Sequence, residues 1–243
     1  MAVQNSLRPQ QQKTTDKLVE YKCGEEIVKL SPTIIRNYLV NGNGNVTDQE
    51  VVMFLNLCRF QHLNPFLREA YLIKFGNQPA TIVTGKDAIT KRAMRNPKFA
   101  GQQAGVVIYH PENGELEYRN GSLLMQNEQL VGGWAKVYVK GYEVPIEAAV
   151  SYQEYVGVKN DGSVNGQWAK KPATMIRKVA LVQALREAFP EDLGGLYASE
   201  EMNIDLDETA TAAPVEIPQQ DAQQEIVDMP DPQQATMEEL QGF

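Results

Sequence analysis

The sequence predicts an α+β fold in which helices pack with a small antiparallel β-meander and a β-hairpin. Some segments repeat apolar residues every three or four positions, which is the period of an amphipathic helix. Other segments are short, rich in β-branched and aromatic residues, and bounded by Gly, Pro and Asn. The chain of 243 residues, 42% of them hydrophobic, is long enough to bury one good-sized core.

Two helices are predicted before residue 65. Ser31 and Pro32 form a helix start, because a capping residue is followed by proline at the first helical position. The stretch 47–50, Thr-Asp-Gln-Glu, is a capping box that opens a second helix, which we expect to run to about Phe60. Residues 18–29, which precede both helices, are short, mixed and amphipathic at best.

From residue 70 the hydrophobic period becomes that of strands. Residues 70–84 predict a β-hairpin, and residues 86–95 a helix with one apolar and one basic side. Further strands, which we expect to form an antiparallel meander, are predicted at 105–109, 115–118, 133–139 and 143–150. A second capping box, residues 151–154, should open a short helix before a flexible loop at 160–166.

The longest helical pattern runs from Trp168 to Pro190. Pro172 suits the first helical position and Pro190 stops the run, while the apolar residues between them form one stripe that should be core. Four basic residues lie seven apart in two pairs, so a helix that began early enough would place them on one side. These are Lys170, Lys171, Arg177 and Lys178.

Charge is distributed unevenly along the chain. The net charge is -8, but no Lys or Arg follows Arg186, and 15 of the 31 acidic residues lie beyond it. Residues 1–186 therefore carry 23 basic and 16 acidic side chains, a balance of +7. Residues 59–98 alone hold eight basic and two acidic side chains. A basic body followed by an acidic tail indicates a polyanion site and a separate interaction segment.

Composition divides the chain into three parts. Residues 1–29 form a polar segment that we associate with assembly, residues 30–198 a core domain, and residues 199–243 an acidic tail. We predict disorder in the tail and at the N-terminus, because neither buries enough apolar surface to offset its ordering entropy. Without an apolar stretch of membrane-spanning length or a signal peptide, we expect a cytoplasmic protein with no membrane partner.

Residue patterns suited to catalysis are few. Cys23 and Cys58 show no zinc-ligand spacing, and His62 and His110 have no His or Cys companion at such a spacing. The sequence also contains no P-loop for a nucleotide. We therefore expect no cofactor, no metal and no enzymatic activity. Scattered single carboxylates leave a metal-dependent nuclease as an alternative.

Binding is the function that the charge pattern favours. Two helices rich in Lys and Arg, flanked by antiparallel strands, would form a groove that follows a phosphate backbone. Affinity should then fall with salt, because each neutralised phosphate releases counterions. Sequence preference should be weak, since no helix-turn-helix or zinc finger is present. The alternative interpretation is that these side chains are solvated helix faces.

Two blocks of sequence carry a resemblance to a known family. The first block joins residues 63–74, from Leu-Asn-Pro-Phe-Leu-Arg to Ile-Lys, with 85–92 and 95–99. The second joins 168–190, from Trp-Ala-Lys-Lys-Pro to Glu-Ala-Phe-Pro, with 194–197, Gly-Gly-Leu-Tyr. In this order, with strands between them, the blocks resemble the phage RecT and Redβ single-strand annealing proteins over about residues 30–200.

The resemblance implies binding of single-stranded DNA and ATP-independent annealing of complementary strands in phage or prophage recombination inside a bacterial host cell. It also implies a basic DNA groove, an annealed duplex intermediate, a homo-oligomer (ring or helical filament), and a phage exonuclease as partner. A host single-strand-binding protein is a further candidate partner. The residues placed at the DNA by the matching blocks, with Trp168 as wall or stacking partner, are Lys86, Lys91, Arg92, Arg95, Lys98, Trp168, Lys170, Lys171, Arg177 and Lys178.

A passive single-stranded DNA-binding protein is the alternative within the same chemistry. Such a protein would share the basic groove but would not accelerate duplex formation. It would also stack bases on aromatic side chains, whereas the basic elements here have few aromatics, Phe99 and Trp168 being the nearest. This composition favours annealing.

Overall fold

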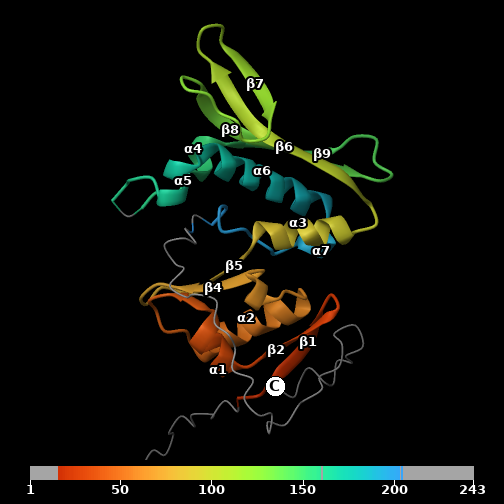
Figure 1. The fold of residues 1–243 in the computed structure, drawn as a ribbon, viewed down its shortest axis with the longest axis vertical. Helices are drawn as coiled ribbons and strands as arrows, with labels where there is room; N and C mark the ends of the chain where they lie inside the picture. The colour runs from red at the N-terminus through yellow and green to blue at the C-terminus, as the bar shows by residue number, and fades with distance from the viewer. Residues whose placement is uncertain (1–15, 160, 203, 205–243) are drawn as a thin grey trace, which may run out of the picture.

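The computed structural model describes residues 16–159, 161–202 and 204, which form an α+β fold (Figure 1). Within this part of the chain the strands form a two-stranded sheet, β1-β2, a three-stranded sheet, β3-β4-β5, and a four-stranded sheet, β7-β6-β8-β9. The predicted α+β class is confirmed. Of the tails for which we predicted disorder, residues 1–15 and 205–243 lie outside the described residues. The first residues of the predicted acidic tail are ordered, because Glu200 pairs with Lys178 and Glu201 with Arg186.

The N-terminal half combines two small sheets with two helices of regular length. β3 pairs in parallel with β4, and the other pairs in these sheets are antiparallel. In chain order the elements are β1 (Val19–Cys23), β2 (Glu26–Leu30), α1 (Pro32–Ile34), the π-helical η1 (Ile35–Leu39), β3 (Val40–Gly42), α2 (Asp48–Phe60), the 3-10 helix η2 (Pro65–Leu67), β4 (Ala70–Lys74), β5 (Thr81–Thr84) and α3 (Lys86–Arg95).

The C-terminal half is a four-stranded antiparallel sheet covered by a long helix. α6 lies across one face of the four-stranded sheet, and α3 and α7 lie next to its C-terminal part (Figure 1). The elements are β6 (Phe99–His110), β7 (Glu115–Asn120), β8 (Gln129–Val139), β9 (Ile146–Ser151), α4 (Tyr152–Tyr155), α5 (Gly166–Lys170), α6 (Pro172–Ala188) and α7 (Pro190–Leu193).

The helix and the sheet lie close together at Gly133 of β8. A Cβ on Gly133 would lie 2.5 Å from the Ile176 carbonyl oxygen of α6, so glycine is needed for this approach. Around it Ile176, Val179, Ala180 and the inward residues of β6 and β8 are fully buried. The predicted apolar stripe of the 168–190 pattern is therefore core, as expected.

Several local signals gave the correct element. Ser31 caps α1 through its side chain, and the capping box of α2 is complete, with the Thr47 N–H donating to Glu50 Oε2 at 2.8 Å. Glu50 also accepts hydrogen bonds from Lys74 Nζ and the Ala80 N–H, both at 2.7 Å. The Lys74 bond is the largest of the influences that lower the pKa of Glu50 to about 2. Helix 86–95, the 70–84 hairpin and the antiparallel pairing of the later strands are also confirmed. The meander is not, because β8 pairs with β6 and not with β7, which gives the order β7-β6-β8-β9.

Other expectations need correction. The segment 18–29 forms the hairpin β1–β2, closed by a two-residue turn in which Gly24 takes a φ of 66°. The helix after Ser151 forms, but the Ser151 side chain makes no capping hydrogen bond. The second helix of the basic pattern begins at Pro172 and not earlier. Lys171, with φ -140° and ψ 52°, separates α5 from α6, so the four basic residues do not share one helical side.

Candidate nucleic-acid interface

A pocket of about 430 Å³ opens beside α3 and contains three of the ten predicted DNA-contacting residues, Lys91, Arg92 and Arg95. Its other walls come from the β1–β2 turn, the C-terminal end of α2, Glu69 before β4, and Asp192 in α7. We call it the α3 pocket. Elements that are far apart in the sequence thus meet at one basic hollow.

The amphipathic pattern of α3 places these cations in the pocket. Ala88, Ile89 and Ala93 are buried on the apolar side of the helix, and the basic residues occupy the remaining surface. Gly85 caps the helix without a side chain, and a Cβ there would lie 2.8 Å from the Arg68 carbonyl oxygen. The start of α3 is therefore held close to the segment that leads into β4.

Lys91 is paired with a buried carboxylate. Its Nζ lies 2.9 Å from Glu69 Oε1, while Glu69 Oε2 accepts the Asn64 N–H at 2.8 Å and lies 3.6 Å from the Cys23 thiol. Burial alone would raise the pKa of Glu69, but the bonds from Asn64 and Lys91 outweigh it, and the pKa is lowered. Glu69 is therefore ionised at neutral pH and compensates the charge of Lys91.

Arg92 is half-buried and donates from Nη1 to the carbonyl oxygen of Gln61, directly after α2. A cation at this position satisfies an unpaired carbonyl and complements the negative end of the helix dipole. Arg92 consequently has a structural role that is independent of any ligand.

Arg95 differs from both neighbours. Its guanidinium lies beside the β1–β2 turn, where a Cβ on Gly24 would stand 3.4 Å from Nη2. The side chain is exposed, and among the described residues it has neither a hydrogen-bond nor an ion-pair partner. Of the three cations in the α3 pocket, Arg95 is the one whose donors remain available to an anion.

The remaining predicted residues fall into an engaged and an available group. Lys86 pairs with Asp87, Arg177 Nε donates to Ser122 Oγ at 2.8 Å, and Lys178 Nζ lies 2.7 Å from Glu200 Oε1. Three exposed lysines make no side-chain contact of this kind within the described part of the chain. These are Lys98, Lys170 and Lys171.

Trp168 lies in the interior. It is 1% exposed, packs edge-to-face against Tyr152 with ring centroids 5.9 Å apart, and belongs to the core cluster. A base cannot stack on a ring that is covered on both faces. The stacking role that we considered for Trp168 does not fit this position, and its remaining role is packing behind the basic α5–α6 junction.

Nine of the twelve residues that line the pocket were absent from the predicted DNA contacts, and two of them show why. His62 ends α2 with a φ of 48°, and the Leu63 N–H reaches back to the Cys58 carbonyl oxygen at 2.8 Å, a helix end at which glycine is usual. Asp192 comes from α7, about a hundred residues further along the chain. The left-handed conformation of a histidine and the meeting of α3 with α7 have no local sequence signal.

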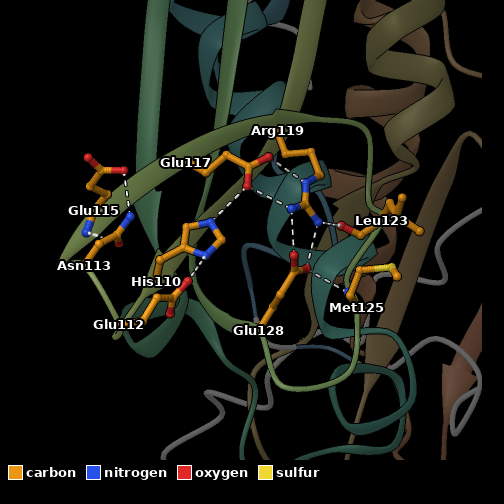
Figure 2. Close-up of polar contacts among 9 residues, drawn as sticks. All are labelled: His110, Glu112, Asn113, Glu115, Glu117, Arg119, Leu123, Met125 and Glu128. Carbon is orange, nitrogen blue, oxygen red and sulfur yellow. Dashed lines mark hydrogen bonds and ion pairs between the residues drawn. The ribbon is translucent and has the colours of Figure 1, made fainter.

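A second polar cluster lies at the far end of the four-stranded sheet (Figure 2). Arg119 of β7 forms paired hydrogen bonds with Glu117, both at 2.8 Å, and with Glu128, both at 2.7 Å, and donates to the Leu123 carbonyl oxygen. His110 contacts the same Glu117 through Nε2 at 3.0 Å. These bonds tie the β7–β8 loop to β7 (Figure 2).

Comparison with known proteins identifies the family. The model of the RecT family matches residues 25–215, which is most of the chain. The protein belongs to the RecT family. This confirms the resemblance drawn from the two sequence blocks and extends it on both sides of residues 30–200.

A curated protein is similar to part of the chain. An uncharacterized protein of Ureaplasma parvum serovar 3 is 31% identical to the chain over 149 residues, which is 61% of the chain. The match covers 55% of that protein, so the chain spans about half the length of this relative.

Among the described residues, no three His, Cys, Asp or Glu side chains are grouped so that they could hold a metal ion. The helices of the described part are also too short or too polar for any of them to cross a membrane.

Proposed function

We propose that this RecT-family protein binds single-stranded DNA through its phosphates and anneals complementary strands without ATP, as an oligomer, in homologous recombination. The observation that carries the proposal is the family match over residues 25–215. Phage origin, a ring or filament form, and recruitment of a phage exonuclease or a host single-strand-binding protein are parts of the same proposal.

The side-chain environments support phosphate contacts at two places. Arg95 in the α3 pocket and the pair Lys170–Lys171 at the α5–α6 junction are exposed and make no internal ion pair within the described residues. An annealing protein must neutralise two backbones and leave the Watson–Crick edges free. Cations without stacked aromatics meet this requirement, because they contact phosphates and leave the bases unbound.

The test is an annealing assay with two complementary fluorescent oligonucleotides, without nucleoside triphosphate, at low and moderate salt. We expect the protein to accelerate duplex formation and its affinity for one strand to fall steeply with salt. Binding without acceleration would indicate passive single-strand binding. Degradation of the strands when magnesium is added would indicate a nuclease.

Substitution of the available cations tests the contacts. Arg95→Gln should weaken single-strand binding about tenfold, or roughly 1–2 kcal/mol, whatever the DNA sequence. The slope of log affinity against log salt should fall by about 0.7, and Lys170→Ala should lower it by a similar amount. Lys136→Gln, which removes a lysine paired with Glu147 on the sheet, is the control and should leave affinity unchanged. Equal effects of all three substitutions would refute these contacts.

A further inference from the structure

The α3 pocket contains two carboxylates, although its proposed ligand is a polyanion. Glu69 and Asp192 line it together with Lys91, Arg92 and Arg95. An uncompensated carboxylate beside a phosphate site repels the ligand, at about 1 kcal/mol for unit charges 4 Å apart in water and more where solvent is excluded. The two acids therefore need separate explanations.

Glu69 is explained by the fold. Its carboxylate is compensated by Lys91, bonded by a backbone N–H, and held close to Cys23, so it joins the β1 strand, the turn after α2 and helix α3. The Lys91–Glu69 pair contributes no net charge to the pocket. Two guanidinium groups and one carboxylate, those of Arg92, Arg95 and Asp192, then determine its field.

Asp192 has no such compensation. Within the described residues its carboxylate accepts one hydrogen bond, from the neutral amide of Asn96, whose Nδ2 lies 2.7 Å from Oδ2. No Lys or Arg of this part is close enough to form an ion pair with the carboxylate. Its charge nevertheless acts on Arg92 in the pocket. Burial lowers the pKa of Arg92, and the Asp192 carboxylate opposes this change.

The hydrogen bond from Asn96 also fixes where this charge lies. Asn96 is the C-cap of α3, directly after Arg95, and Asp192 stands in the short helix α7 that packs against α3. The carboxylate is thus held by an amide that leaves its charge intact, in the pocket that Arg95 also lines. A purely structural contact would be served equally by a neutral acceptor.

We propose that Asp192 limits the affinity of the α3 pocket for DNA phosphate. The role rests on the proposed function: Asp192 lowers the phosphate affinity of the neighbouring guanidinium groups and does not itself contact DNA. Annealing requires that a bound strand shift register against its complement, so each protomer must release and regain phosphates readily. A carboxylate that offsets one of two guanidiniums keeps the phosphate affinity of each protomer low. Many aligned protomers together retain the strand.

The experiment measures binding of a labelled homopolymeric single strand by the full-length protein at about 50 mM and about 200 mM salt. Asp192→Asn keeps the acceptor for Asn96 and removes the charge, and we expect affinity to rise threefold to tenfold at the lower salt. The gain should shrink at the higher salt because the charges are screened. Annealing at saturating protein should become slower, since each contact is released less often.

Glu191→Gln is the matched control. Glu191 precedes Asp192 in the same helix, carries the same charge and is exposed, but it does not line the pocket. We expect it to change affinity by less than about twofold. A comparable rise in both variants would indicate a general charge effect and overturn the proposal.

A fall or no change in affinity for a folded Asp192→Asn protein would likewise overturn it, because Asp192 would then act as a structural contact alone. Asp192→Ser, which is smaller and also uncharged, repeats the measurement, and thermal melting establishes that each variant is folded. Failure of the proposed function gives a different result. In that case the unaltered protein would not bind the strand, whereas failure of this inference leaves wild-type binding and its weakening by Arg95→Gln intact.

Discussion

Helices α3 and α6 look alike in sequence, since both combine an apolar pattern with several Lys and Arg residues, but their environments differ. α6 buries nine of its 17 residues, and α3 buries three of ten. A helix that is apolar on most sides must lie inside, so its few cations reach the surface only at its margins. α3 keeps a full polar side, and that side forms the basic pocket.

The difference shows that the number of basic residues on a helix is not the number available to bind a ligand. Arg177 and Lys178 of α6 are engaged by Ser122 and Glu200, whereas Arg95 of α3 has no partner in the described chain. Arg119 at the end of the sheet is the extreme of engagement, with four hydrogen bonds to two carboxylates (Figure 2). We therefore rank the cations as candidate DNA contacts by the internal partners that each one has, and not by their number along a helix.

The largest effect should come from the core beside α6. Trp168→Ala should lower the free energy of unfolding by about 3–5 kcal/mol, because it removes a large side chain that is 1% exposed. Chemical denaturation monitored by circular dichroism measures this. The milder Trp168→Phe keeps an aromatic ring against Tyr152 and should bind DNA with wild-type affinity. Weaker DNA binding by a folded Trp168→Phe protein would indicate that Trp168 contributes to the DNA interface.

Trp168 also marks the limit of sequence-based prediction in this chain. The fold class, the helix bounds of 86–95 and the capping box at Thr47 were readable because caps, period and turn residues act locally. The break at Lys171 also has a local cause, because the residue before a proline is disfavoured in helical conformation. Burial of Trp168 and the engagement of Lys178 depend on tertiary contacts. No period in the sequence distinguishes an aromatic residue that lines a groove from one that packs behind it.

The residues of the α3 pocket could also be predicted only in part. Lys91, Arg92 and Arg95 were correctly expected to lie together, because they occupy one side of a helix. Glu69 was visible as one of two acids in a basic stretch, but its pairing with Lys91 was not. Asp192 enters from α7, and contacts between such distant segments leave no mark on either one.

A smaller effect is expected from the engaged lysine of α6. Lys178→Met should lower the free energy of unfolding by about 1–2 kcal/mol, because Glu200, whose side chain is 8% exposed, loses the cation that compensates it. DNA affinity should change little, since Lys178 is already occupied. Thermal melting and single-strand titration test the two statements separately.

Lys86→Met serves as the control for Lys178→Met. Its partner Asp87 has a side chain that is 92% exposed, and surface ion pairs of this kind contribute little to stability. The comparison of α3 with α6 would fail if Lys178→Met left stability unchanged and weakened DNA binding. Lys178 would then be released from Glu200 when DNA binds.

The smallest effect should be a pH dependence at the end of the sheet. His110 Nε2 lies 3.0 Å from Glu117 and Nδ1 lies 3.3 Å from Glu112, and the hydrogen bond to Glu117 is the main cause that raises the pKa of His110 (Figure 2). A raised pKa means that the folded state binds the proton more tightly than the unfolded state. The stabilisation is therefore complete below the ordinary histidine pKa of about 6.5 and is lost as pH rises through the raised value.

The variant His110→Gln tests this sign. The wild-type melting temperature should exceed that of the variant at pH about 5.5, and the difference should decline as pH rises to about 8. Single-strand affinity should show no matching change, because the His110 cluster and the α3 pocket share no residue. A stability difference that grows with pH would contradict the charge assignment. A parallel change in DNA affinity would instead mean that the cluster at the sheet end, although its arginine is fully engaged, belongs to the DNA interface.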